Sequence, residues 1–276
     1  MHLLLGNPGE ACLAAVRDAL HDRGHTSTTL ASPLAQPARL AWRLDNDRSE
    51  STLAWDDESL RSDEIESVLI LGAGWIDPAG WEPDDLTYVQ SETHAALLAW
   101  LWSLPCPVVN RFPAAIWYRP HAPLVAWHGR LRRAGLPSPR TLLTNVPRDA
   151  RAFAPDGAVY GALSSDTRYL VTSEEDWNGL AELQRVTPVC LTEPHGEAQA
   201  VCVVGERVVW DRDPHPELEP ALRTFATEAG LACVELAVAE TERGTSVVAV
   251  EPQPRLEHFG DDARAEIVDA LVELLT

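Results

Sequence analysis

Residues 231–252, LACVELAVAETERGTSVVAVEP, contain two apolar runs separated by a short polar segment. The runs Leu231–Ala239 and Ser246–Val250 have the length and the valine-rich composition of buried strands. Glu242-Arg243-Gly244 between them has the composition of a turn. The two runs are therefore expected to form neighbouring strands of one sheet.

The sequence around this pair predicts a mixed α+β region in the C-terminal third. Three more strands are expected at Val189–Thr192, Gln199–Val204 and Arg207–Trp210. Gly205-Glu206 is the expected hairpin turn between the last two of them. Helices are expected at Pro216–Ala229, which Gly230 closes, and at Asp261–Leu275.

The N-terminal third begins with a strand, a glycine-containing turn and a helix, which is a Rossmann-like opening. These elements are expected at His2–Leu5, Gly6–Gly9 and Glu10–Asp22. The turn lacks the full Gly-x-Gly-x-x-Gly pattern, so a dehydrogenase-type dinucleotide site is disfavoured. Further strand and helix signals follow at Val68–Leu71, Ser91–Ser103 and Pro107–Asn110. Their alternation predicts a mostly parallel sheet up to about residue 115, with residues 31–61 irregular and residues 76–85 a loop.

The middle of the chain predicts short strands and two helices. A helix is expected at Ala122–Ala134 with Gly135 as its left-handed cap, and a second at Glu174–Gln184 with Ser173 as its N-cap. Short strands are expected at Thr141–Thr144, Ala158–Tyr160 and Tyr169–Thr172. Together the signals predict an α/β domain at residues 1–115 and two α+β subdomains at residues 116–187 and 188–276, with a cleft between the last two.

Composition excludes several function classes. The 276 residues carry 22 arginines and 42 acidic residues, and the net charge is −20. Such an acidic surface repels phosphate backbones and anionic membranes, so neither nucleic acid nor a membrane is an expected partner. No apolar run approaches the ~20 residues that span a bilayer, and the start is too short and too uncharged for a signal peptide. A cytoplasmic protein with reduced cysteines is expected.

The sequence contains no lysine, so all of its basic residues except histidine are arginines. A Schiff base, a Walker-type phosphate clamp and a lysine general base all need an amine side chain. These three mechanisms are therefore excluded.

Four phrases in their order along the chain resemble the ATP-grasp superfamily, and most closely its ribosomal-protein glutamate ligases and graspetide peptide ligases. They lie at residues 107–111 (PVVNR), 132–141 (RRAGLPSPRT), 201–208 (VCVVGERV) and 231–252. The resemblance implies an ATP-grasp-like architecture, α/β followed by α+β, with an N-terminal Rossmann-like domain.

The resemblance also implies a chemistry. The family uses ATP and magnesium to phosphorylate a carboxylate, which an amine then attacks, and it needs two lysines near the nucleotide phosphates. The alignment puts Leu124 and Gly161 at the lysine positions and Ser164-Ser165-Asp166-Thr167 at a glycine-rich lid. The family's metal-binding acids and amide correspond here to Glu235, Glu251 and Gln253.

Two functions follow. The preferred one is a degenerate ATP-grasp protein, a pseudo-ligase that acts as a binding or scaffolding module for a peptide or for a catalytic ligase in peptide modification or natural-product biosynthesis, without a cofactor. The alternative is a working carboxylate–amine ligase that uses ATP and Mg²⁺, with arginines in place of the lysines. The oligomeric state, including a homodimer, is left open.

Each of the remaining candidate site residues also has a simpler possible role. The cofactor-binding candidates are Arg119, Arg130, Arg140 and Glu193, although each arginine can also pair with the acidic excess. Tyr118, Trp127 and His128 either line the cleft or pack in the core. Asp211, Asp213 and His215 either hold a metal or mark the start of the next helix.

Overall fold

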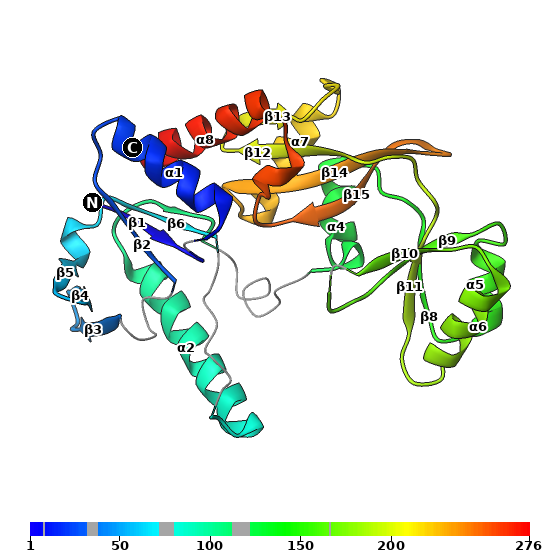
Figure 1. Cartoon of the computed structure of the whole chain (residues 1–276), viewed down its shortest axis with the longest axis horizontal. Helices are drawn as coiled ribbons and strands as arrows, with labels where there is room; N and C mark the ends of the chain where they lie inside the picture. Colours follow the sequence, from blue (N-terminus) through cyan, green and yellow to red (C-terminus); the bar gives the residue numbers. More distant parts are fainter. Residues whose placement is uncertain (8, 32–37, 72–79, 112–121, 166) are drawn as a thin grey trace.

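The computed structural model describes residues 1–276 except 8, 32–37, 72–79, 112–121 and 166. The described part contains four sheets, which follow one another along the molecule rather than merging into one doubly wound sheet (Figure 1). Three of them have four strands and one has three. In the described residues no helix is long and apolar enough to cross a membrane.

The first sheet is parallel, as the sequence predicts, and has the order β2-β1-β6-β7. Its strands are β1 (His2–Leu5), β2 (Ser27–Leu30), β6 (Ser67–Ile70) and β7 (Val108–Val109). Both faces of β1 are buried, because Leu3 and Leu5 enter one core and Leu4 enters the other. Helix α1 (Ala11–Asp22) covers the second face, and α2 (Pro83–Ser103) contributes to the first.

Residues 39–61 correct a prediction. They form a three-stranded antiparallel sheet of β3 (Arg39–Leu44), β4 (Ser49–Trp55) and β5 (Glu58–Arg61), followed by the 3-10 turn η1 (Ser62–Glu64). One face of β4 is buried through Ser51, Leu53 and Trp55, while the polar face is exposed. Trp100 of α2 donates from Nε1 to Ser51 Oγ at 2.8 Å, which fixes this small sheet to α2. The prediction of an irregular segment is therefore wrong for residues 39–61.

Helix α2 also begins earlier than the sequence suggests. It starts at Pro83, a position where a proline costs no hydrogen bond, so the loop expected through Asp85 ends before it.

The central sheet is antiparallel and has the order β10-β9-β11-β8. Its strands are β8 (Thr141–Thr144), β9 (Ala158–Gly161), β10 (Arg168–Val171) and β11 (Val189–Thr192). Helices α5 (Pro147–Phe153) and α6 (Glu174–Leu183) pack on it with a small core of their own. Ser173 caps α6 as predicted, because its hydroxyl accepts from the Asp176 N–H at 3.1 Å. Helix α5 was not predicted.

The C-terminal sheet has the order β13-β12-β14-β15 and contains two of the four phrases that carry the resemblance, residues 201–208 and 231–252. Its strands are β12 (Gln199–Val204), β13 (Arg207–Trp210), β14 (Cys233–Thr241) and β15 (Gly244–Glu251). Helix α7 (Glu219–Ala229) covers one face, and it begins three residues after the predicted start. Helix α8 (Asp261–Leu275) covers the other face and also packs on α1 (Figure 1).

Two features join the parts of the fold. Asn110, fully buried after β7, accepts from the Cys233 N–H at 2.8 Å and donates to the Pro252 carbonyl at 3.1 Å, so it ties the first sheet to β14 and to the end of β15. Helix α4 (Leu124–Ala134) packs on α7, with the rings of Trp127 and Phe225 5.7 Å apart. The division at residues 115 and 187 stays a prediction.

Candidate functional site

A polar pocket opens on the face of the C-terminal sheet where two acidic residues meet. Glu235 on β14 is the direct cross-strand partner of Glu251 on β15, so both side chains project from the same face of the sheet. The pocket has a volume of about 450 Å³. It is lined by Arg168, Ala198, Gln199, Ala200, Asp211, Arg212, Glu235, Ala237, Ala249, Glu251, Arg255 and His258. The pairing of the two acids, expected from the family resemblance, is present.

Glu235 is nearly fully buried, at 2% exposure, and the chain satisfies both of its carboxylate oxygens. The Arg255 backbone N–H donates to Oε2 at 2.7 Å, and His258 Nδ1 lies 2.6 Å from Oε1. Burial raises the pKa of Glu235 above its ordinary value, and the two hydrogen bonds oppose that rise without cancelling it. This carboxylate is therefore held by nitrogen donors.

Arg255 meets the second acid with its side chain. Its Nη2 lies 3.6 Å from Glu251 Oε1, and its buried Nε has no hydrogen-bond partner among the described residues. Gln253, the third expected metal ligand, is exposed and is not among the residues that line the pocket. One arginine thus serves both carboxylates, one through its backbone and one through its guanidinium.

This donor set does not fit magnesium. Mg²⁺ takes oxygen ligands in near-ideal octahedral geometry, whereas both oxygens of Glu235 already accept from nitrogen. A cation between Glu235 and Glu251 would have to displace His258 and to compete with Arg255.

Two more arginines line the same pocket. Arg212 ion-pairs with Asp211 at 3.3 Å and with Glu197 at 3.0 Å. Arg168 donates to the Val248 carbonyl at 3.3 Å and makes no ion pair with any described residue. Arg168 is therefore the cation in this pocket that the surrounding acids leave uncompensated.

A second, narrow pocket of about 30 Å³ lies between the central and C-terminal sheets. Leu124 and Gly161, the two positions that the resemblance assigns to lysines, both line it together with Arg168 and Val248. The fold therefore brings the two lysine positions together. Arg168 on β10 is the direct cross-strand partner of Gly161 on β9, so its side chain emerges beside the second lysine position.

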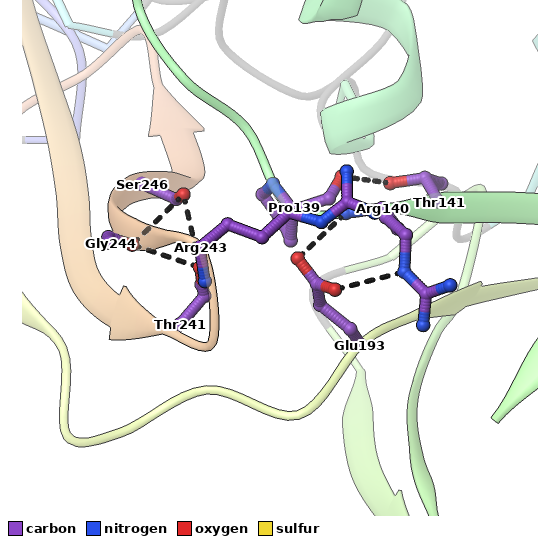
Figure 2. A network of polar contacts seen from close by, with 8 residues as sticks. All are labelled: Pro139, Arg140, Thr141, Glu193, Thr241, Arg243, Gly244 and Ser246. Atoms are coloured by element: carbon purple, nitrogen blue, oxygen red, sulfur yellow. Dashed lines mark hydrogen bonds and ion pairs between the residues drawn. The ribbon is translucent and has the colours of Figure 1, made fainter. Parts of the chain in front are cut away.

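None of the cofactor-binding candidates that the structure describes lines either of these two pockets. Arg140 donates from its backbone N–H and from Nε to the two oxygens of Glu193, at 3.0 and 3.1 Å (Figure 2). Arg130 lies over the ring of Trp127 and lines a separate pocket near Glu228. Arg119 and Tyr118 lie outside the described residues.

The simpler alternatives fit the other candidates. Trp127 is buried against Phe225, and His128 Nδ1 contacts the Ser138 hydroxyl at 2.9 Å. His215 pairs with Glu217 at 3.2 Å. The described structure does not bring His215 together with Asp211 and Asp213 into a group that could hold a metal.

Sequence reasoning missed Arg168, Arg255 and His258. Arg255 and His258 follow β15 in a segment without helix or strand periodicity, which left no pattern to place them. The only available signal was their spacing of four and seven residues after Glu251.

Comparisons with known proteins were made on the sequence and on the structure. No protein-family model and no curated protein matches the sequence. The structure is similar to the macrocyclase MdnC from Microcystis aeruginosa MRC, which was crystallised with its precursor peptide MdnA (TM-score 0.79, 19% identity, 100% of this chain and 99% of that one).

Two other solved structures are also similar. One is a RiPP-associated ATP-grasp ligase from Chryseobacterium gregarium, in complex with ADP and a leader and core peptide (TM-score 0.79, 11% identity, 99% of this chain and 96% of that one). The other is a RimK domain protein ATP-grasp from Sphaerobacter thermophilus DSM 20745 (TM-score 0.60, 20% identity, 99% and 100%). The chain therefore has the ATP-grasp fold, and the predicted fold class is confirmed.

Proposed function

We propose that this chain is a degenerate ATP-grasp protein, a pseudo-ligase that binds a peptide in the modification of a natural-product precursor. The observation that carries the proposal is the substitution of the phosphate site. Leu124 and Gly161 line one pocket at the two lysine positions, and the chain has no lysine that a small shift of alignment would supply. Phosphoryl transfer depends on fixed cations around the phosphates, so this loss removes its main stabilisation.

The acidic pair supports the same proposal. In a working ligase of this fold the late-strand acids would hold the metal through free carboxylate oxygens. Here Arg255 and His258 occupy the oxygens of Glu235, and Arg255 also faces Glu251. The negative charge that a metal would neutralise is thus neutralised by the chain itself.

The narrow pocket between the central and C-terminal sheets also supports the pseudo-ligase. The pocket at Leu124 and Gly161 has a volume of about 30 Å³. A single water needs ~10–15 Å³ on this measure, so the pocket as it stands has room for only a few waters.

A peptide is the proposed ligand because two of the similar structures contain one. MdnC was crystallised with a precursor peptide, and the Chryseobacterium ligase with a leader and core peptide. A pseudo-ligase would keep this binding function and present the peptide to a catalytic ligase.

Nucleotide binding tests the proposal directly. Millimolar ATP with Mg²⁺ is expected to leave the melting temperature unchanged, and calorimetry is expected to show no heat of binding. A ligand at 100 times its dissociation constant would stabilise the chain by about 2.7 kcal/mol, a shift of several degrees for a chain of this size. A saturable, magnesium-dependent shift would overturn the pseudo-ligase. An active ATP-grasp ligase, measured in the same buffer, is the positive control.

The second candidate function is a working ATP-dependent carboxylate–amine ligase, and one observation favours it. Arg168 has no ion pair with any described residue and emerges beside Gly161 on the neighbouring strand. Arginine binds phosphate well, so Arg168 is the residue that would replace the missing lysine. ATP turnover in the presence of a carboxylate and an amine, lost in Arg168→Ala and kept in Arg243→Ala, would establish this function.

A further inference from the structure

Three side chains that can ligate a metal meet at the amino end of the first sheet, on a different sheet from the acidic pocket. His2 begins β1, His25 lies two residues before β2, and Glu66 directly precedes β6. The three strands are parallel neighbours, with His2 opposite both Ser27 and Ser67. One ligand atom from each of the three side chains lies within 4.8 Å of the other two.

Two of the three distances between these atoms are close to those between the ligands of a tetrahedral metal ion. His2 Nε2 lies 3.4 Å from His25 Nδ1 and 3.2 Å from Glu66 Oε2. Zinc bonds to nitrogen and oxygen of about 2.0–2.1 Å place tetrahedral ligand atoms about 3.3–3.4 Å apart, whereas an octahedral ion with the same bonds would bring adjacent ligands to about 2.9 Å. Both distances from His2 are therefore nearer to the tetrahedral value than to the octahedral one.

The surroundings of His2 suit a metal ligand. The residue is 2% exposed, and its Nδ1 lies 2.8 Å from the hydroxyl of Ser67, which is also buried. The contact between Nδ1 and Ser67 fixes the orientation of the ring and leaves the lone pair of Nε2 for a metal. Histidines that bind metals commonly have such a contact at their other ring nitrogen. Burial also lowers the pKa of His2, which favours the neutral ring that a metal requires.

The backbone holds the three residues in place before any ion binds. The His2 N–H donates to the Thr26 carbonyl at 2.9 Å, and the Glu66 N–H donates to the Met1 carbonyl at 3.0 Å. The Met1 amino group takes the other oxygen of Glu66, Oε1, at 3.0 Å, so that Oε2 faces His2. Little rearrangement is needed for the three atoms to share one ion.

We propose that His2, His25 and Glu66 form a zinc-binding site, with Nε2, Nδ1 and Oε2 as ligands and a water as the fourth. The carboxylate of Glu66 is exposed, which leaves the outer side of the site open to that water. Two imidazoles and one carboxylate are a ligand set that zinc accepts. The ion would join the starts of three strands, and its role would be to stabilise the first sheet.

The test uses the full chain without a polyhistidine tag, stripped of metal with a chelator and titrated with Zn²⁺ alone. One equivalent is expected to bind and to raise the melting temperature. His25→Gln and Glu66→Gln are each expected to weaken zinc binding at least tenfold. Both residues are only partly buried or exposed, so these variants avoid the folding problem that a substitution of buried His2 would bring.

Two matched histidine variants make the assignment specific. His21→Gln removes a histidine on the exposed face of α1 and is expected to bind zinc like the parent. His215→Gln removes a histidine that pairs with Glu217 on another part of the surface and is expected to do the same. The proposal is overturned if the parent binds no zinc at micromolar concentrations, if His25→Gln binds as the parent does, or if only His215→Gln loses the ion.

Discussion

His258 Nδ1 lies 2.6 Å from Oε1 of Glu235, so a histidine from the segment after β15 closes the pocket that two paired acids form. The other oxygen of Glu235 accepts from the Arg255 backbone N–H. A buried carboxylate with both oxygens occupied by the chain is part of the structure rather than a free metal ligand. This relationship leads to predictions on pH, metal binding and stability.

The free energy of unfolding should decrease as the pH rises, and Glu235 should be responsible for part of that decrease. Burial raises the pKa of this carboxyl above the ordinary 4.5, so the folded chain holds the proton more tightly than the unfolded chain. Its stabilising contribution is therefore complete below pH 4.5 and is lost as the pH rises through the folded pKa. Denaturant melts of the parent and of Glu235→Gln between pH 4 and 7 should show the variant gaining relative to the parent as the pH rises.

Glu251→Gln is the matched control for this experiment, because it changes the directly paired residue, which is less buried. It should not reproduce the pH dependence. At neutral pH, replacing both acids by glutamine should cost little stability, because their partners Arg255 and His258 are partly exposed and stay solvated without them. A loss of several kcal/mol in the double variant would contradict this account.

Removing the Arg255 side chain should make Glu251 more available to a cation. Arg255→Ala leaves Glu251 without its guanidinium partner and the pocket with one positive charge fewer. We expect Arg255→Ala to bind Mn²⁺ or Mg²⁺ roughly tenfold more tightly than the parent, because two neighbouring carboxylates that lack the guanidinium attract a cation more strongly. Isothermal calorimetry measures the difference.

The control is Arg243→Ala in the turn between β14 and β15, where the arginine is exposed and far along the strands from the acids. Both variants change the net charge equally, so a general field effect would appear in both. Equal metal affinity of the two variants would rule out Arg255 as the group that neutralises the acidic pair.

Asn110 should be one of the most sensitive positions in the chain. Its amide bonds the Cys233 N–H and the Pro252 carbonyl, and its backbone has φ of 59° in the left-handed region. Asn110→Ala removes both hydrogen bonds. It also puts alanine, which adopts the left-handed region less readily than asparagine, at this position. A loss of about 2–4 kcal/mol is therefore expected. Urea denaturation gives the value.

Asn110→Gly separates the two causes. Glycine adopts positive φ at no steric cost but supplies neither hydrogen bond. It should be less destabilised than Asn110→Ala by about 1 kcal/mol. If both variants are as stable as the parent, the two hydrogen bonds do not hold the first sheet to the C-terminal sheet.

The ion pair between Arg140 and Glu193 should stabilise the end of the central sheet where the chain enters β8 and leaves β11. Glu193 is almost completely buried while Arg140 is half-exposed, so Arg140→Ala leaves a buried carboxylate with only its backbone donor (Figure 2). We expect a loss of about 1–2 kcal/mol, below the value for a fully buried pair because solvent screens the guanidinium. A double-mutant cycle with Glu193→Gln measures the coupling; a value near zero would show that the ion pair adds nothing to the backbone hydrogen bond.

Periodicity in the sequence was enough to predict most of the fold. The C-terminal strands, α1 and the capped helix α6 have clear apolar patterns, and each is present. The sheet at residues 39–61 was missed because its strands bury only one face and expose charged residues such as Arg43 and Glu50 on the other. Helix α5 was missed because it has seven residues, too few for a helical pattern to stand out.

The site was predictable only in part. Glu235 and Glu251 lie in regular strands, so their pairing could be expected from the alignment. The partners that decide their chemistry, Arg255 and His258, lie just before and within a three-residue 3-10 helix, which is too short for a sequence pattern to place them in space. The zinc candidates His25 and Glu66 are 41 positions apart, and only the parallel register of the first sheet brings them together.

The emptiness around Gly161 has a consequence for anyone who would rebuild a ligase from this chain. A Cβ added at Gly161 would meet nothing within 4 Å, so the first carbon of a lysine side chain can be placed there without a clash. It would, however, emerge beside Arg168 on the adjacent strand and near the pocket that Arg255 already neutralises. Repulsion between these cations would push the new amine away from where the phosphates would lie. A designer would therefore have to take the arginines out before putting a lysine in.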